Sequence, residues 1–241
     1  YYAGKLTGKF GAIALGLLDW LAPVASRKFL NCPRKLHPIT AALICLTELK
    51  ESGNRHGPEF EDHWIHTFSE LAATPGSPFC AWGLGFPWMS KNGLYDPDIP
   101  FVTHTPYVME ALSSFRDPRA VEMLDSTWKF LESLIVMTES ESELALSYAP
   151  VQEPRIVVNA NSYAAYAYAL HAARGHKQKK SLDRCRRLVN WILNKQNADG
   201  LWWYYADDSS GNFIDCFHTC FVVKNLVKAS SLVPEFQAIA R

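Results

Sequence analysis

The most constraining feature of this sequence is an internal repeat that opens with His-Thr. HTPYVMEAL (104–112) aligns with HTCFVVKNL (218–226) without a gap, at an offset of 114 residues, or two units of 57. A third copy, NANSYAAYAYAL, lies between them and ends at Leu170, and a degraded fourth copy is HPITAALICL (37–46). Repeats of this length are typical of proteins that stack one supersecondary unit many times.

Each unit consists of two helices separated by a long loop. Apolar residues at helical spacing predict helices over 5–21, 37–53, 58–74, 103–115, 118–137, 159–174, 179–196 and 216–230, with the start of another over 233–241. Long loops over 75–102, 138–158 and 197–214 precede every second helix, and no segment shows the alternation that predicts a strand.

Tandem helix pairs can form an open solenoid or a closed α/α toroid. Long loops that always fall on the same side favour the toroid, with the even-numbered helices inside and the odd-numbered helices outside. Inner helices crowd the axis and need small residues, as in 159–170, whereas the bulky segment 126–136 suits an outer helix. We therefore predict an all-α, single-domain α/α toroid over 1–241, an incomplete barrel of five or six helical hairpins with long loops on one face.

The overall charge gives no reason to expect a polyanionic partner. The 24 Lys and Arg residues balance the 24 Asp and Glu residues, so nothing draws the chain to nucleic acid or an anionic membrane. No apolar run approaches the roughly 20 residues that span a bilayer, and no signal peptide is recognisable. The six cysteines show no CxxC spacing, which predicts a reducing, cytoplasmic compartment. The sequence leaves the oligomeric state open.

The repeat gathers candidate site residues at one mouth of the toroid, where the even helices begin. Flat aromatic rings stack on sugars, short polar side chains meet hydroxyl groups, and helix N-termini favour an anionic group such as a uronate carboxylate or a sugar phosphate. We expect catalytic roles for His104, Tyr148, Asp215 and His218. We expect contacts with a carbohydrate substrate from Trp82, Trp88, Arg155, Asn159, Asn161, Trp202, Tyr204 and Asp207.

These assignments have structural alternatives. His-Thr at a helix start could be capping alone, with Thr105 and Thr219 as caps. Asp215 and His218, three residues apart, could be a base with its orienting partner or a surface ion pair. The loop tryptophans could seal the end of the barrel, and the Asp-Asp dipeptide at 207–208 could form a solvated turn.

Cofactor and metal motifs are missing from the sequence. His63 and His66 with Asp62 could offer ligands from one helical turn, but that helix is an outer one in this scheme and no fourth ligand has suitable spacing. There is no GxGxxG, P-loop or GxSxG motif, so dinucleotide, NTP and serine-hydrolase functions have no support. We expect neither a metal nor a cofactor.

Two resemblances support the toroid. Residues 196–202 (QNADGLW) match the QxxxGxW repeat of terpenoid cyclases and protein prenyltransferase β subunits, which are α/α toroids, although the DxDD motif and the zinc ligands of those enzymes are absent. The chain also resembles a bacterial group of α/α-toroid proteins encoded with polysaccharide and lipopolysaccharide biosynthesis. The residues that carry this resemblance are YYAGKLTGKF, WGLGFPW, ALSYAP followed by NANSYAAYA, and QNADGLWWYY with IDCFHT.

The second resemblance implies a glycan-related role, with six-hairpin glycosidases, polysaccharide lyases and glucuronyl C5-epimerases as structural relatives. A hydrolase would need a carboxylate pair, drawn from Asp96, Asp98, Asp207, Asp208 and Asp215. A lyase or epimerase would need a base, an acid and a group that neutralises a uronate carboxylate, and the histidines and tyrosines of the mouth favour this second type. The alternatives are a non-catalytic glycan-binding scaffold and a terpenoid cyclase-like or prenyltransferase-like enzyme.

Overall fold

The computed structural model describes residues 6–31, 35–53, 55–73 and 79–236, and the chain divides into two compact units, Tyr1–Leu36 and His37–Arg241. The first unit contains α1 (Leu6–Leu21) and α2 (Pro23–Phe29). Asp19 of α1 accepts hydrogen bonds from Ser26 Oγ (3.0 Å) and Arg27 Nε (3.1 Å) of α2, which fixes the corner between the two helices. The prediction that the whole chain is one domain stays a prediction.

The second unit contains the repeated helices. They are α3 (Pro38–Glu51), α4 (Pro58–Glu70), α5 (Thr105–Leu112), α6 (Pro118–Ser133), α7 (Val158–Ala173), α8 (Gln178–Asn194) and α9 (Cys216–Leu232). Proline stands in the first turn of α3, α4, α5 and α6, where a missing N–H costs nothing and the fixed φ angle is already helical. The helices predicted from apolar spacing are therefore confirmed, within a few residues at their ends.

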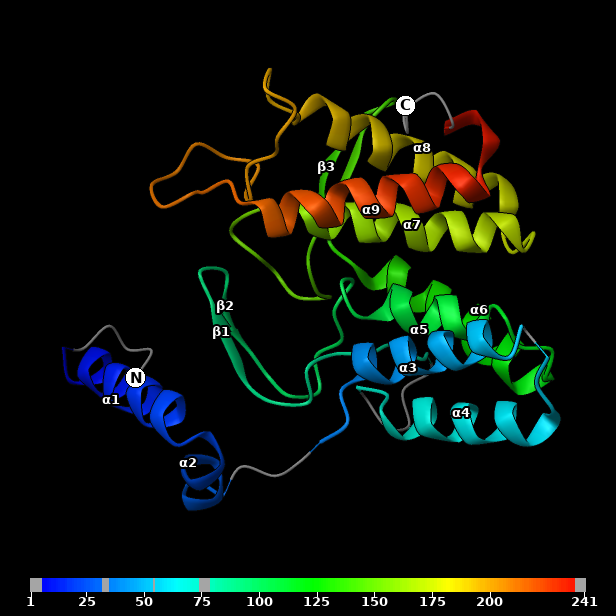
Figure 1. The fold of residues 1–241 in the computed structure, drawn as a ribbon. Helices are drawn as coiled ribbons and strands as arrows, with labels where there is room; N and C mark the ends of the chain where they lie inside the picture. The colour runs from blue at the N-terminus through cyan, green and yellow to red at the C-terminus, as the bar shows by residue number, and fades with distance from the viewer. Residues whose placement is uncertain (1–5, 32–34, 54, 74–78, 237–241) are drawn as a thin grey trace. The chain divides into compact units, whose positions relative to one another are not determined.

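Contacts between the helices arrange them in two layers. One layer runs α3, α5, α7, α9, with each helix packed on the next, and α4, α6 and α8 pack behind α3, α5 and α7 respectively. Figure 1 shows α7, α8 and α9 together and α3 to α6 together within this unit. Every residue of α7 from Val158 to Ala172 is buried, because α7 has neighbours on several sides. Its alanine-rich sequence lets those neighbours approach, as an inner helix requires.

Two short antiparallel hairpins interrupt the helices and correct the prediction that the chain has no strands. Strand β1 (Trp88–Ser90) pairs with β2 (Gly93–Tyr95), and β3 (Val136–Glu139) pairs with β4 (Leu144–Leu146). The helix predicted to reach residue 137 ends at Ser133, because Leu134 takes an extended conformation and the chain enters β3. Strands of three or four residues are too short to show a recognisable alternation in sequence.

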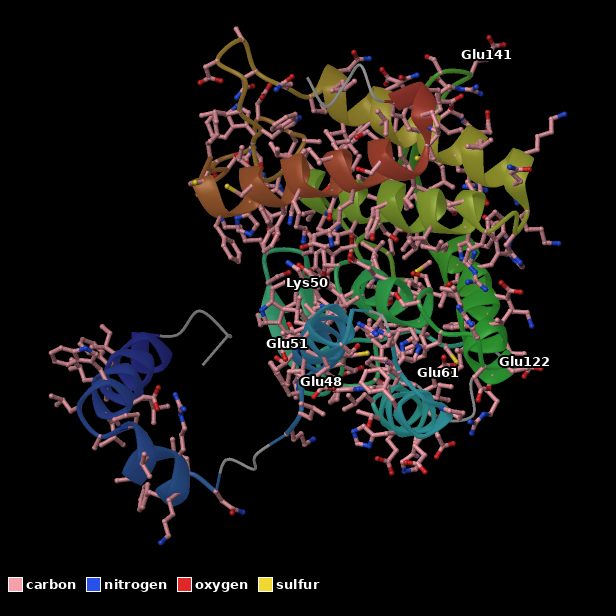
Figure 2. The ribbon with its side chains drawn as sticks, turned by 45° about the vertical axis from the view of Figure 1, so that its right-hand side comes forward. Glu48, Lys50, Glu51, Glu61, Glu122 and Glu141 are labelled. Atoms are coloured by element: carbon pink, nitrogen blue, oxygen red, sulfur yellow. The ribbon has the colours of Figure 1, made fainter. Side chains whose placement is uncertain are left out.

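A buried carboxylate ties α4 to the start of α6. Glu61 of α4 accepts hydrogen bonds from the backbone amides of Arg116 (3.0 Å) and Asp117 (2.7 Å) and lies 2.9 Å from Nε2 of His56 (Figure 2). Burial acts to raise the pKa of Glu61, but these hydrogen bonds outweigh it and the pKa lies below its ordinary value. Glu61 therefore stays ionised and holds the turn that begins the next helical hairpin.

The C-terminal end of the described chain is a 3₁₀ turn, Pro234–Phe236. Most of the further helix expected over 233–241 lies outside the described residues. Within the described residues, no helix combines the length and apolar character that crossing a membrane requires.

Candidate functional site

The loops before α5, α7 and α9 lie at one end of the second unit and form a continuous surface over the N-termini of these helices (Figure 1). The amide of Val102 donates to the carbonyl of Tyr148 (3.1 Å), and the amide of Val158 donates to the carbonyl of Tyr204 (2.9 Å). The β1–β2 hairpin joins this surface through Asn92, whose side-chain amide donates to a backbone carbonyl in the loop before α7 (3.0 Å). We call this surface the mouth.

Asp215 and His218 form a hydrogen-bonded pair at the start of α9. The Asp215 carboxylate caps the helix by accepting from the His218 amide (2.7 Å), and its two oxygens lie 2.9 and 2.7 Å from His218 Nδ1. Asp215, and not the sequence candidate Thr219, is therefore the cap of this helix. Burial acts to raise the pKa of Asp215, but the hydrogen bonds from His218 prevail and the pKa lies below its ordinary value.

The ionised Asp215 decides which nitrogen of His218 can react. A carboxylate accepts only, so Nδ1 carries a proton and donates it to Asp215, and in the neutral imidazole Nε2 then holds the lone pair. The side chain of His218 is 26% exposed, which leaves it within reach of a ligand. Its ring packs against Tyr204, with centroids 4.5 Å apart and planes at 67°. An imidazole oriented by a carboxylate in this way is able to accept a proton at Nε2. The catalytic role expected for Asp215 and His218 stays a prediction.

His104, the sequence counterpart of His218, has a different environment. It is only 6% exposed, and its ring lies 5.0 Å from that of His37 and 5.5 Å from that of Phe101. Burial, reinforced by the charge that His37 can carry, lowers the pKa of His104 to about 3. The imidazole is therefore neutral at physiological pH, with Nδ1 3.1 Å from the Thr103 hydroxyl. Its neighbour Thr105 does not cap α5 but bonds the loop, donating to the carbonyl of Phe101 (3.1 Å).

Tyr148 connects the His104 environment to the rest of the mouth. The Thr103 hydroxyl donates to the Tyr148 hydroxyl oxygen (2.8 Å), so the proton of Tyr148 itself remains available for donation. Burial is the main cause that raises the pKa of Tyr148 to about 12, which keeps the phenol protonated. Tyr204 is also held protonated, because burial and then the electrostatic influence of Tyr148 raise its pKa above the ordinary value.

Glu153 holds the mouth together and was not identified from the sequence. It is 2% exposed, accepts the hydroxyl proton of Tyr95 (2.7 Å) and accepts from the amide of Tyr148 (2.7 Å). Burial is the main cause that raises its pKa. In the sequence, Glu153 is the only acid of the mostly apolar segment 144–158, and a buried carboxylate has to find hydrogen-bond donors.

Trp88 forms an aromatic platform above the mouth. Its ring stacks on Tyr95 at 5.4 Å with a 17° interplanar angle, and it lies 5.9 Å from the rings of Phe101 and Tyr148. The side chain is partly exposed, so one face remains open to a flat apolar surface such as that of a sugar ring.

Arg155 and Asp207, two expected substrate contacts, bind each other. The guanidinium donates to both carboxylate oxygens of Asp207 (2.8 and 2.7 Å) and lies 3.6 Å from the ring centroid of Tyr205. This bidentate pair lowers the pKa of Asp207. Asp207 therefore occupies the hydrogen-bonding edge of Arg155. The expected contact of Arg155 with a substrate stays a prediction.

Three more expected substrate contacts belong to the packing of the fold. Trp82 is fully buried and its indole donates to the carbonyl of Phe68 (2.8 Å), while the indole of Trp202, 5% exposed, donates to the carbonyl of Ile192 (2.8 Å). Asn161 is 1% exposed, and its side chain accepts from the amide of Leu146 and donates to the carbonyl of Leu146. These hydrogen bonds join the three side chains to the protein backbone, and their expected contacts with a substrate stay predictions.

Asn159 keeps a free acceptor at the start of α7. It is 6% exposed, and among the described residues nothing hydrogen-bonds its side-chain oxygen. Asn159 lies in the first turn of an inner helix, and its expected contact with a ligand stays a prediction.

A basic residue that the sequence analysis did not identify lies between α5, α7 and α9. Nζ of Lys224 donates to the hydroxyl of Tyr107 (2.6 Å) and lies 4.4 to 4.9 Å from the ring centroids of Tyr107, Tyr163 and Phe221. These residues line a narrow crevice on the inner layer together with Lys228. The sequence indicated Lys224 only as a single lysine in the mostly apolar first half of α9.

The metal candidates of the sequence are engaged in surface ion pairs. His66 lies 3.3 Å from Glu70, and Asp62 lies 2.8 Å from Arg119. Among the described residues, the ligand atoms of Asp62, His63 and His66 do not form a group close enough to hold one ion.

Comparisons with known proteins bear on the fold. No protein-family model and no curated protein matches this sequence. Among solved structures, a glycosyl hydrolase of family 88 from Bacteroides vulgatus matches 92% of this chain and 72% of its own, with a TM-score of 0.56 and 12% identity. A family 105 glycoside hydrolase from C. acetobutylicum ATCC 824 matches 95% of this chain and 71% of its own, with a TM-score of 0.56 and 14% identity.

These similarities confirm the predicted fold class, a mostly helical α/α toroid. At such low identity they speak for the fold alone. The number of hairpins in this chain stays a prediction.

Proposed function

We propose that the protein is a carbohydrate-active enzyme that moves a proton on a sugar bearing a carboxylate, with His218 as the base. The observation that carries the proposal is the Asp215–His218 pair. The carboxylate fixes Nδ1, so Nε2 is the proton acceptor, and the side chain is accessible at the mouth. Proton removal α to a uronate carboxylate is the chemistry that such a pair supports.

Two further groups of the mouth support this chemistry. Tyr148 is the proposed acid, because Thr103 donates to its oxygen and leaves its own proton to give. Lys224 of the inner layer is the proposed partner of the substrate carboxylate, because Arg155 is occupied by Asp207, whereas the described partners of the Lys224 ammonium group are uncharged hydroxyl groups and rings, those of Tyr107 and Tyr163 among them. Trp88 would support the apolar face of the sugar.

This assignment favours lyase or epimerase chemistry over hydrolysis. A glycoside hydrolase needs two carboxyl groups free to act across the bond. Two of the candidate acids are committed elsewhere, Asp207 to Arg155 and Asp215 to His218.

The substrate class rests on resemblance as well as on geometry. The similar structures are named glycoside hydrolases, and the sequence resembles toroid proteins of bacterial polysaccharide and lipopolysaccharide biosynthesis. We propose a bacterial surface glycan or its precursor as substrate. The described cysteines, Cys45, Cys80, Cys185, Cys216 and Cys220, are free thiols, which supports the proposed cytoplasmic location.

Proton exchange at the sugar tests the proposal. Uronic acids, uronate oligosaccharides, nucleotide sugars and neutral oligosaccharides would be incubated with the protein in D₂O and followed by NMR. An epimerase incorporates deuterium at C5, a lyase creates a C4–C5 double bond together with a new reducing end, and a hydrolase creates a new reducing end alone. We expect one of the first two outcomes on a uronate, abolished in His218→Ala and retained in His66→Ala, which alters an exposed surface histidine. New reducing ends with neither deuterium at C5 nor a C4–C5 double bond, or either of these two signals retained in His218→Ala, would contradict the assignment.

The alternatives make different predictions. A non-catalytic glycan-binding scaffold would bind oligosaccharides through Trp88 without any turnover. A terpenoid cyclase-like enzyme needs an apolar inner cavity, whereas the inner crevice carries Lys224, Lys228 and Glu110. A thermal shift with prenyl diphosphates and not with uronates would favour the cyclase-like alternative.

A further inference from the structure

A cluster of potential metal ligands lies at the opposite end of α7 from the mouth. Asp125 of α6, His171 in the last turn of α7 and His176 in the α7–α8 turn each offer one ligand atom, and these atoms lie within 4.8 Å of one another. Twelve residues separate His171 from Asn159, since 171 − 159 = 12, so the cluster is about 18 Å along the helix from the mouth.

The local backbone places His176 against the end of α7. Gly175 and Lys177 both adopt positive φ angles (76° and 47°), which turns the chain sharply between α7 and α8. The amide of His176 donates to the carbonyl of His171 (3.0 Å), and its Nδ1 lies 3.3 Å from Oδ1 of Asp125. The turn therefore presents an imidazole to the outer helix α6.

His171 brings an unshared lone pair into this cluster. Its side chain is fully buried, and Nε2 lies 3.0 Å from the Thr127 hydroxyl oxygen. Because the Thr127 hydroxyl donates to the carbonyl of Leu124 (2.7 Å), Nε2 is the donor to Thr127 and Nδ1 is unprotonated. Within the described part of the chain, Nδ1 has no hydrogen-bond partner. A buried acceptor without a donor is costly, and a cation would satisfy it.

We propose that Asp125, His171 and His176 bind one divalent cation of the zinc class. Around a tetrahedral zinc with bonds of about 2.0–2.1 Å, ligand atoms lie about 3.3 Å apart. Asp125 and His176 already stand at 3.3 Å, and both are partly exposed, so small rotations of these two side chains close the site on His171 Nδ1. Water would complete the coordination on the exposed side.

The donor set decides between classes of cation. Two imidazoles and one carboxylate suit zinc, nickel or cobalt, whereas magnesium and calcium prefer oxygen ligands throughout.

The bound cation would have a structural role. It would link the outer helix α6 to the turn that joins α7 and α8, beneath the ring of Trp128, which meets His171 edge-on at 5.6 Å and lies 5.9 Å from His176. Without a cation, the contact between Asp125 and His176 is an ordinary ion pair. Metal binding separates the two cases.

Isothermal titration of the chelator-treated full chain with zinc, magnesium and calcium chlorides tests the proposal. The background would carry Cys216→Ser and Cys220→Ser, because these exposed sulfur atoms lie 3.6 Å apart and could bind zinc by themselves. We expect one zinc per chain and no binding of magnesium or calcium. His176→Ala and Asp125→Asn should weaken zinc binding by more than the roughly 10–100-fold that a lost outer-shell partner costs. His66→Ala, which removes an exposed histidine of α4, should leave it unchanged.

Two further measurements keep the test decisive. Both variants alter partly exposed side chains, so their melting temperatures in chelator should stay near that of the parent, while only the parent should gain stability with zinc. Cobalt should give the visible absorption of a tetrahedral site in the parent alone. Zinc binding of parental affinity in His176→Ala and Asp125→Asn, or no stoichiometric zinc in the parent, would overturn the proposal.

Discussion

The two His-Thr copies align without a gap and lie at the starts of α5 and α9, yet their histidines have different environments. His104 is packed between His37 and Phe101 and is held neutral by burial. His218 stands at the surface of the mouth with a carboxylate on Nδ1. The difference comes from the residue three positions before each histidine, which is Phe101 in one copy and Asp215 in the other. The alignment therefore leaves a difference at the helix start, where His104 is the N-cap of α5 whereas Asp215 is the N-cap of α9.

Replacing the two histidines separately should have the largest effects and should affect different properties of the protein. His218→Ala should lower turnover by roughly 10²- to 10⁴-fold, the usual contribution of a general base, with little change in the melting temperature. His104→Ala should chiefly destabilise the protein, because it empties a buried site. Steady-state rates and melting curves of both variants check this, and a reversed pattern would move the base to His104.

Two substitutions of Asp215 should separate its capping role from its orienting role. Asn caps helices as well as Asp does, so Asp215→Asn should keep stability but lose turnover, because it no longer fixes the Nδ1 proton of His218. Asp215→Ala should lose turnover and about 0.5–2 kcal/mol of stability as well. Full activity in Asp215→Asn would reduce the pair to a helix cap.

Substitutions of Lys224 and Arg155 should likewise differ in their effects on the binding of a uronate. Lys224→Met should raise KM or Kd for a uronate by about 10- to 100-fold, the range that a charge-assisted hydrogen bond of roughly 1.5–3 kcal/mol represents. Arg155→Ala should leave binding nearly unchanged, since Arg155 is occupied by Asp207. Titrations of both variants with the same ligand check this prediction. A loss of binding in Arg155→Ala alone would instead assign the substrate contact to Arg155, as expected from the sequence.

The buried histidine should also appear in the pH dependence of stability. The folded-state pKa of His104 is about 3, below the 6.5 of the unfolded chain, so below pH 6.5 the unfolded state binds a proton that the folded state excludes. The contribution of neutral His104 to the free energy of unfolding is complete above pH 6.5. It is lost as the pH falls toward 3, by up to about 1.4 kcal/mol per pH unit. Urea unfolding of His104→Gln and of the parent at several pH values should show a shallower acid decline in the variant. Parallel declines would contradict the burial of a neutral His104.

The order of helices and loops could be predicted from the sequence because it follows from periodicity. The proximity of Asp215 and His218 could also be predicted from their spacing, because an N-cap side chain lies close to the residue three positions later. The strands could not be predicted, because Val136–Glu139 is too short to show a period and is apolar enough to extend a helical pattern.

The partners of polar groups far apart in the chain could not be predicted either. Arg155 meets Asp207 and Tyr95 meets Glu153 only because the loops of successive repeats pack together. The same holds for Trp202, whose indole donor is used by the carbonyl of Ile192. A candidate list drawn from residue types alone therefore mixes side chains that hold the mouth with side chains that face a ligand.

The most direct test of the account is the state of the two imidazoles, read by ¹⁵N NMR of histidine-labelled protein with and without a uronate. The account predicts that His218 carries its proton on Nδ1 and that the ligand shifts its Nε2 resonance, while the His104 resonances stay unchanged. A proton on Nε2 of neutral His218, or a ligand response at His104 instead, would contradict the assignment of His218 as the base.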